Sequence, residues 1–159
     1  MIAENEIVLD KVDLNILRLM QENSRITNAD LARELNMAPS GVLERVKKLE
    51  QKNVILQYTT RLNPIPLNQK LLAFVFMKAA DGLGCSTTGK ELAKMPEVQE
   101  VHHIAGDDCY LVKIRTADSA SLMELMRKHF SKLPNIISTR TTIVLETVKE
   151  QQQFIIPEK

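Results

Sequence analysis

One polar face on a predicted helix has the residue types that could contact nucleic acid. Proline is favoured in the first turn of a helix, so the helix is predicted to begin near Pro39 and to turn Val42, Val46 and Leu49 inward. The opposite face and its flanks combine small or polar residues with cations: Ser40, Gly41, Glu44, Arg45, Lys47 and Lys48. Small N-terminal residues let a helix sit deep in a major groove, where the cations could reach phosphates. The alternative interpretation is an ordinary solvated helix face.

Two earlier helices are predicted to support this one. Asp10 can cap the first of them, and the hydroxyl of Thr27, three residues before Asp30, can cap the second. Asn36 follows the second helix and tolerates the left-handed conformation that a tight turn requires. Two short helices joined by such a turn, behind a supporting helix, are the helix-turn-helix arrangement.

The segment after the third helix is predicted to form a wing. Asn53 can end the helix, and residues 54–55 and 58–62 have the composition of two short strands. Asn63 then precedes Pro64 and Pro66, which cannot continue a helix or a central strand. We therefore expect one domain over residues 1–63 and another over residues 64–159.

The second domain is predicted to be α+β. Strands are expected at residues 71–79, 98–105, 109–116 and 136–148, with one helix opened by a capping box at Thr88 and another capped by Asp118. Residues 94–98 and 132–136 form a weak repeat, Lys-Met-Pro-Glu-Val and Lys-Leu-Pro-Asn-Ile, at the same junction between helix and strand. A βαβ-like unit that occurs twice is typical of the ferredoxin-like βαββαβ fold.

The first strand of this domain is apolar on both of its faces. Leu72, Phe74 and Phe76 fall on one face, while the other carries Ala73 and Val75 among further apolar residues. Helices in this fold cover only one face of the sheet, so the second face needs another cover. We expect a second copy of the chain to supply it, and a homodimer also suits DNA sites with two half-sites about one helical turn apart.

Overall composition does not decide the question of DNA binding. The net charge is +1, and residues 1–62 contain nine Lys or Arg against nine Asp or Glu. No apolar run approaches the roughly 18 residues of a membrane span. Residues 1–9 lack the apolar stretch of a secretory signal, and Cys85 and Cys109 are too few for a disulfide framework. We expect a cytoplasmic protein with two reduced thiols.

A series of short fragments runs along nearly the whole chain, from Leu9 to about Val148: Leu9-Asp10, Asp13, Ile16-Leu17, Arg25-Ile26-Thr27, Leu31-Ala32, Arg45-Val46, Leu49-Glu50, Val54-Ile55, Tyr58, Pro96-Glu97-Val98, Gly106-Asp107, Tyr110-Leu111, Leu133-Pro134 and Thr139-Arg140-Thr141. Together these fragments resemble the Lrp/AsnC (feast/famine) family of regulators. Each fragment is common, but the order and spacing are specific. The resemblance implies a winged helix-turn-helix joined to a βαββαβ effector domain, dimers that often assemble to octamers, and a response to amino acids.

The resemblance also implies positions for two sites. The DNA-reading segment would be Pro39 to Lys48, with Arg25, Thr27 and Asn28 near the DNA backbone. The effector site would combine a glycine turn with the last strand: Gly106, Asp107, Asp108, Cys109, Thr139, Thr141 and Thr142. Backbone N–H groups at such a turn can hold a carboxylate, and a carboxylate side chain can hold an ammonium group. Cys109 occupies the position of the acid in the family's G-x-x-D motif, so the resemblance does not decide whether this chain binds an amino acid.

Two other functions match parts of the sequence less well. A metal or redox sensor would use Cys85, Cys109, His102 and His103, but adjacent histidines in a strand point to opposite faces and cannot chelate one ion together. Some haem-pathway decarboxylases share the two-domain architecture. The chain, however, has no Trp, only two Tyr and no paired acid and base. We therefore expect no enzyme activity, no cofactor and no metal.

Overall fold

The computed structural model describes residues 7–80 and 87–158, which divide into two compact units. The N-terminal unit combines the chain up to Arg61 with the segment from Glu150 onward, and the sheet unit spans Leu62–Lys149. The sequence predicts a boundary between residues 63 and 64 and places the final segment in the second domain, whereas the compact units divide between Arg61 and Leu62 and the segment from Glu150 onward groups with the first. The segment does so because Gln21 hydrogen-bonds to the main chain of Phe154.

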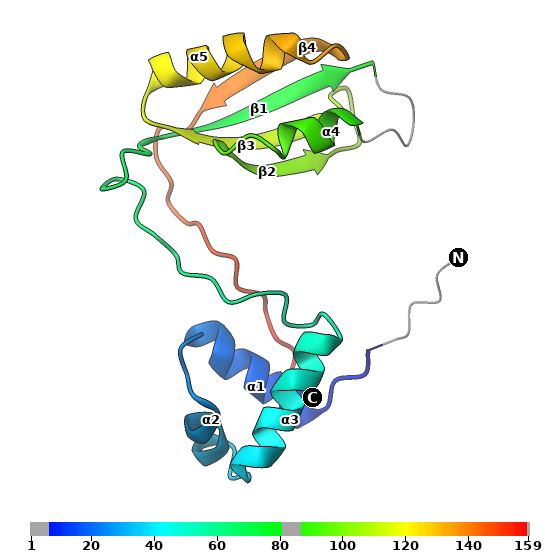
Figure 1. The fold of residues 1–159 in the computed structure, drawn as a ribbon, viewed down its shortest axis with the longest axis vertical. Helices are drawn as coiled ribbons and strands as arrows, with labels where there is room; N and C mark the ends of the chain where they lie inside the picture. Colours follow the sequence, from blue (N-terminus) through cyan, green and yellow to red (C-terminus); the bar gives the residue numbers. More distant parts are fainter. Residues whose placement is uncertain (1–6, 81–86, 159) are drawn as a thin grey trace. The chain divides into compact units, whose positions relative to one another are not determined.

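Three helices build the N-terminal unit: α1 (Lys11–Glu22), α2 (Asn28–Glu34) and α3 (Pro39–Gln51) (Figure 1). Asp10 caps α1 as predicted, in a reciprocal capping box with Asp13. Thr27 caps α2 by accepting a hydrogen bond from the N–H of Asp30 at 3.1 Å. Ala38, which has no side-chain acceptor, precedes α3.

Asparagine provides the predicted turns of this unit. Asn36 after α2 has a φ of 53°, and Asn53 after α3 has a φ of 55°, so both adopt the left-handed conformation that few non-glycine residues tolerate. The turn at Asn36 lets α2 and α3 pack around one apolar core. The buried members of that core are Ile16, Leu31, Ala32, Val42, Val46 and Leu49.

The predicted wing strands are not formed. Among the described residues, no strand is assigned between the end of α3 and Leu71. Val54 and Ile55 instead donate their N–H groups back to the carbonyl of Leu49, which completes the end of α3. Residues 58–62 are exposed and have no assigned secondary structure, and an isolated pair of short strands is marginal in water.

The sheet unit has the predicted ferredoxin-like βαββαβ order. Its elements are β1 (Leu71–Ala79), α4 (Thr87–Leu92), β2 (Val98–His103), β3 (Tyr110–Thr116), α5 (Ser119–Lys128), a 3-10 turn (Phe130–Lys132) and β4 (Ile136–Ile143). The strands lie in the order β2-β3-β1-β4, and all neighbours are antiparallel. Asp118 caps α5 as predicted by accepting from the N–H of Ser121.

Four predicted features of this unit differ from the structure, the smallest being the start of β3 at Tyr110, one residue after the predicted start. β4 ends at Ile143, not at residue 148, because its partner β1 begins at Leu71 and the Val144 N–H makes a last bond to Leu72. β2 ends at His103, two residues before the predicted end. Thr88 lies within α4 with a buried side chain, so it does not cap that helix.

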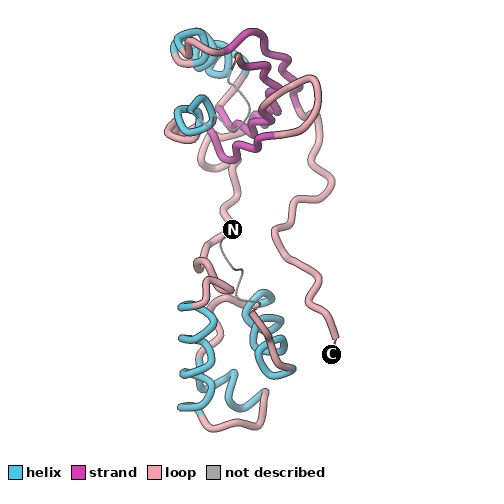
Figure 2. Tube along the Cα trace, turned by 90° about the vertical axis from the view of Figure 1, so that its right-hand side faces the viewer, coloured by secondary structure: helices cyan, strands magenta, loops and turns pink. Residues whose placement is uncertain are grey.

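The two helices of the sheet unit cover one face of the sheet (Figures 1 and 2). The core on that face includes Ala73, Val75, Met77, Tyr110, Val112 and Ile114. Strand alternation places Phe74 and Phe76 on the other face, where they are half-buried and, among the described residues, no helix packs over them. We call this second side the open face. Nowhere in the described ranges is a helix long and apolar enough to cross a membrane.

Candidate nucleic-acid interface and effector site

The exposed face of α3 carries the cations that the sequence singled out. Lys47 and Lys48 are both exposed, and neither is ion-paired with another residue that the structure describes. Ser40 and Glu44 lie exposed nearer the start of the helix, and Gly41 is half-buried there. The helix therefore has small and polar side chains at its N-terminal end and two exposed lysines further along, which is the arrangement expected of a helix that lies in a DNA groove.

A shallow concavity of about 380 Å³ lies beside this face. It is formed where the end of α1 and the start of α2 meet α3, and its lining residues are Met20, Ser24, Ile26, Thr27, Asn28, Leu43, Val46, Lys47, Glu50 and Tyr58. Three residues expected near DNA thus share one surface: Thr27, Asn28 and Lys47. Hydroxyl, amide and ammonium groups are donors that contact the phosphate backbone.

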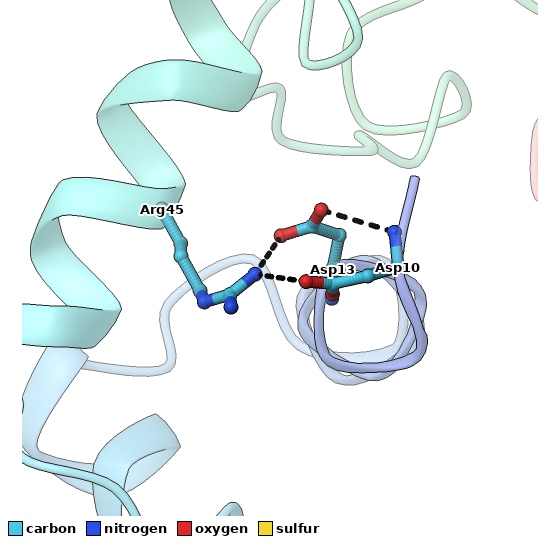
Figure 3. Close-up of polar contacts among 3 residues, drawn as sticks. All are labelled: Asp10, Asp13 and Arg45. Carbon is cyan, nitrogen blue, oxygen red and sulfur yellow. Dashed lines mark hydrogen bonds and ion pairs between the residues drawn. The ribbon is translucent and has the colours of Figure 1, made fainter. Parts of the chain in front are cut away.

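Arg45 is placed differently from the other candidate cations (Figure 3). Its guanidinium donates to the carboxylate of Asp10 at 2.7 Å and to that of Asp13 at 2.8 Å. These ion pairs raise the pKa of Arg45, with Asp10 the larger contributor. The hydrogen bond from the Asp13 N–H, together with Arg45, lowers the pKa of Asp10. Arg45 therefore joins α3 to the first turn of α1 and does not extend freely from the surface.

The remaining predicted DNA-binding residues lie at the start of the second helix. Arg25 is exposed, and its N–H donates to the side chain of Asn23 at 3.0 Å. The Thr27 hydroxyl both accepts from the Asp30 N–H and donates to the Asp30 carboxylate, so it is engaged in capping. Asn28 is half-buried at the first position of α2.

Tyr58 takes part in this surface, although sequence reasoning assigned it only to a wing strand. Its hydroxyl donates to the carboxylate of Glu50 at 2.7 Å. Partial burial and this hydrogen bond raise the pKa of Tyr58 to about 12. The contact fixes the segment after Asn53 along the end of α3. No spacing rule predicts it, because it joins a helix to an irregular segment.

In the sheet unit, one residue joins the two segments predicted to bind an effector. Arg140 of β4 donates to the carboxylate of Asp108, in the turn between β2 and β3, at 3.1 Å. Its guanidinium carbon also lies 4.2 Å from the centre of the Phe76 ring. Sequence reasoning listed the threonines around Arg140 but omitted Arg140 itself. The signal was available, because Arg140 is the one cation in that stretch.

Strand register divides the predicted threonines between the two faces. Thr139 and Thr141 pair with Met77 and Val75 of the helix-covered face, whereas Thr142 pairs with Phe74 of the open face. Only Thr142 therefore shares its face with Arg140, which pairs with Phe76. All three threonines are exposed because β4 is an edge strand.

The thiol of Cys109 contacts the neighbouring strand β1. Its sulfur atom lies 3.4 Å from both the N and the O of Ala79, so the side chain is turned toward the main chain at the end of β1. Asp107 is exposed, and Gly106 has a φ of 144°, which favours glycine. Of the two carboxylates in this turn, that of Asp108 is held in place, by its ion pair with Arg140.

The two histidines of the alternative metal or redox sensor make separate contacts. His102 contacts the carboxylate of Glu100 at 3.1 Å, and His103 stacks on Tyr110 with ring centres 5.1 Å apart. Within the described ranges, no group of three or more His, Cys, Asp or Glu residues is arranged to hold a metal. Cys85 lies outside the described residues.

Comparison with known proteins identifies the family. Residues 9–55 match winged helix-turn-helix DNA-binding domains, and residues 72–154 match the Lrp/AsnC ligand binding domain. The leucine-responsive regulatory protein of Klebsiella pneumoniae is 35% identical over 150 residues, which cover 93% of this chain and 92% of that protein. The chain belongs to the Lrp/AsnC family. The leucine-responsive regulatory protein of Escherichia coli K12 has the same identity and coverage.

Solved structures of Lrp/AsnC regulators have the same fold. A Neisseria meningitidis transcriptional regulator, solved as a complex with L-Met, superimposes with a TM-score of 0.85 at 26% identity, covering 93% of this chain and 97% of that one. The leucine response regulatory protein LrpA of Mycobacterium tuberculosis superimposes with a TM-score of 0.82 at 30% identity, covering 94% and 100%. The chain is therefore a DNA-binding transcriptional regulator with a ligand-binding domain, and its relatives are regulators, not enzymes.

Proposed function

We propose that this Lrp/AsnC regulator reads DNA with the exposed face of α3 and responds to a free amino acid bound in its sheet unit. The observation that carries the first half is the pair of unpartnered cations, Lys47 and Lys48, beside the concavity that contains Asn28. Ser40 and Glu44 would face base edges, while the two lysines meet phosphates. We infer a cytoplasmic location, because a protein that reads DNA works in the compartment that holds the DNA.

The second half of the proposal concerns the effector. The Neisseria relative was solved with L-Met, and the relatives from Klebsiella and Escherichia are named for their response to leucine. In this chain the corresponding binding region would lie at the turn formed by Gly106, Asp107 and Asp108 and along β4. Its polar groups match a ligand that carries both a carboxylate and an ammonium group.

We further propose that the protein is a homodimer that assembles to an octamer. Phe74 and Phe76 on the open face are the support, because an apolar sheet face without a helix over it favours burial against a second copy. A two-fold dimer would present two copies of α3 to one DNA site. Sedimentation of the full chain would report one mass near that of a dimer or a multiple of it.

The test combines DNA binding with ligand binding. Wild-type protein is titrated with a fragment containing its own promoter region at several salt concentrations, with and without each of the twenty amino acids. We expect salt-dependent binding, because phosphate contacts release counterions, and a change in affinity with at least one amino acid. A thermal-shift screen should show about 2.7 kcal/mol of stabilisation at a ligand concentration 100 times its dissociation constant. If wild-type protein showed no salt-sensitive DNA binding, the proposal that the exposed face of α3 binds DNA would be refuted.

A further inference from the structure

Glu44 lies at the middle of the exposed face of α3. A helix turns by about 100° per residue, so Glu44 is about 160° away from both Val42 and Val46, whose side chains are buried in the core. Lys47 and Lys48 are exposed and lie about 60° and about 40° from Glu44, on opposite sides of it. The carboxylate is therefore directed away from the core of the unit, with one exposed cation on each side.

The Glu44 carboxylate has no partner within the part of the chain that the structure describes. Lys47 and Lys48 are three and four residues further along, the spacings of helical salt bridges, but neither forms one with it. The other carboxylate of α3, that of Glu50, accepts from the hydroxyl of Tyr58 at 2.7 Å. Of the two acids on this helix, only Glu50 thus has a contact that holds the unit together, and Glu44 is available to a partner outside it.

An acid at this position opposes the approach of α3 to DNA. Every nucleotide carries a negatively charged phosphate, so a carboxylate that enters a groove is repelled and also loses its bound water. Lys47 and Lys48 can reach the phosphates along the two edges of the groove, which leaves Glu44 between them, facing the base edges. The cost of bringing Glu44 there is offset only where a base presents a hydrogen-bond donor.

The four bases differ in what they present to a carboxylate, which can only accept hydrogen bonds. In the major groove guanine presents two acceptors, and thymine presents an acceptor and a methyl group. Adenine presents its N6 amino group beside the acceptor N7. Cytosine presents its N4 amino group and no acceptor. Cytosine is therefore the base whose edge matches a glutamate.

We propose that Glu44 selects cytosine at one position of the DNA site by accepting a hydrogen bond from its N4 amino group, while Lys47 and Lys48 bind phosphates on either side. This inference rests on the proposed reading of DNA by α3 and names the base that one residue reads. The lysines supply affinity for any sequence, and the glutamate lowers it wherever the donor is missing. Glu44 thus contributes to specificity by penalising the wrong bases.

The experiment compares the DNA sites that full-length wild type and its variants select from a pool of random-sequence duplexes. Wild type is expected to prefer cytosine at one position by about 5- to 100-fold, the discrimination of a good contact to a base edge. In Glu44→Gln the preferred base at that position should change to adenine, because glutamine donates to N7 and accepts from N6. Glu44→Ala should lose the preference there, while the other positions keep theirs.

A second measurement and a control separate base reading from charge. On unrelated DNA, Glu44→Ala should bind more tightly than wild type with an unchanged salt slope, because a repelled carboxylate is gone and both lysines remain. Glu34→Gln removes the same charge from the last residue of α2, where the side chain is also exposed, and should select the same sites as wild type. Thermal melting followed by circular dichroism establishes that each variant is folded.

Each outcome has a defined meaning. A change of the selected base that is confined to the Glu44 variants supports the inference, since a merely structural role would weaken binding to all sequences alike. Identical sites in wild type and in both Glu44 variants overturn it, and salt-sensitive binding would then leave the proposed reading of DNA by α3 intact. Wild-type selection of a base other than cytosine at that position, or the same change in Glu34→Gln, also overturns it. Absence of salt-sensitive DNA binding by wild type overturns both proposals.

Discussion

The guanidinium of Arg45 donates to the carboxylate of Asp13 at 2.8 Å, and this contact joins α3 to the first turn of α1 (Figure 3). The Asp13 carboxylate in turn accepts from the N–H of Asp10 at 3.2 Å. One arginine therefore supports both the capping box of α1 and the orientation of α3. In a helix-turn-helix unit that orientation determines which side chains enter a groove.

Arg45→Gln should reduce stability more than it reduces direct contact with DNA. The side chain is partly exposed, so we expect a loss of about 1 kcal/mol in the free energy of unfolding of the N-terminal unit. Urea denaturation followed by circular dichroism measures this. The salt slope of DNA binding should stay at the wild-type value. A smaller slope with unchanged stability would instead place Arg45 on a phosphate.

The Asp10 carboxylate should make the stability of the N-terminal unit depend on pH. Hydrogen bonding from the Asp13 N–H and from Arg45 lowers the pKa of Asp10 below its ordinary value of 3.8. Its contribution is therefore present above that value and is lost as the pH falls through the lowered pKa. In Asp10→Asn this contribution is missing at every pH. The difference in stability between wild type and variant should shrink as the pH falls from about 5 toward 2. A constant difference would contradict the ion pair.

Lys47 and Lys48 should provide sequence-independent affinity for DNA. We expect Lys47→Gln combined with Lys48→Gln to weaken binding about equally on the promoter fragment and on unrelated DNA. The slope of log affinity against log salt should fall by about 2, because each phosphate contact contributes about 0.9. Gel-shift titrations over a salt series provide both quantities. Lys132→Gln in the sheet unit is the matched control, and an equal effect there would remove the special role of α3.

Local patterns explain why most of the N-terminal unit could be predicted. The caps at Asp10 and Thr27 and the turns at Asn36 and Asn53 depend on residues at most a few positions apart. The helical spacing of Val42, Val46 and Leu49 likewise predicts their burial. These are short-range rules, and the structure confirms them.

Contacts between distant segments could not be predicted in the same way. Arg45 matched the pattern of a phosphate-binding cation, and only the packing of α1 on α3 shows that Asp13 engages it. The end of β4 depends on where β1 begins, and the role of Arg140 depends on register with Phe76 and on the reach of Asp108. Such relations arise from tertiary structure, which overrides local propensity.

Two glycines in helices provide a matched test of packing. A Cβ on Gly89 of α4 would lie 2.9 Å from the ring of Tyr110, a buried core residue, whereas a Cβ on Gly41 of α3 would meet only Met37 at 3.7 Å. In Gly89→Ala the steric conflict should therefore destabilise the sheet unit by about 1–3 kcal/mol. The higher helix propensity of alanine should offset about 1 kcal/mol of this loss. Gly41→Ala should stabilise the N-terminal unit by up to about 1 kcal/mol.

Thermal unfolding of the two alanine variants distinguishes these effects. A melting temperature of Gly89→Ala equal to that of wild type would show that the Tyr110 ring moves aside without loss of stability. DNA titration of Gly41→Ala adds a functional measurement, because an added methyl group at the start of a reading helix should hinder its approach to a groove. Higher stability combined with weaker DNA binding is the expected pattern. Unchanged DNA affinity would place Gly41 away from the contact surface.

Gln21 should hold the C-terminal segment on the N-terminal unit. Its side-chain amide donates to the carbonyl of Phe154 and accepts from the same residue's N–H, both at 2.8 Å, so the primary amide pairs with one residue as a neighbouring strand would. The carbonyl of Gln21, near the end of α1 where helix carbonyls lack helical partners, accepts from the side chain of Gln153 at 3.0 Å. Three hydrogen bonds therefore join this segment to one residue of α1.

Replacing Gln21 by Ala removes the two side-chain bonds and leaves α1 intact, since alanine is a strong helix former. The Phe154 amide should then exchange its hydrogen about fivefold faster, which corresponds to the net contribution of about 1 kcal/mol from an exposed hydrogen bond. Hydrogen exchange followed by mass spectrometry or NMR measures this rate. Gln152→Ala, one residue away from the contact, is the control and should leave the rate unchanged. Equal protection in both variants would mean that Gln21 does not hold the segment.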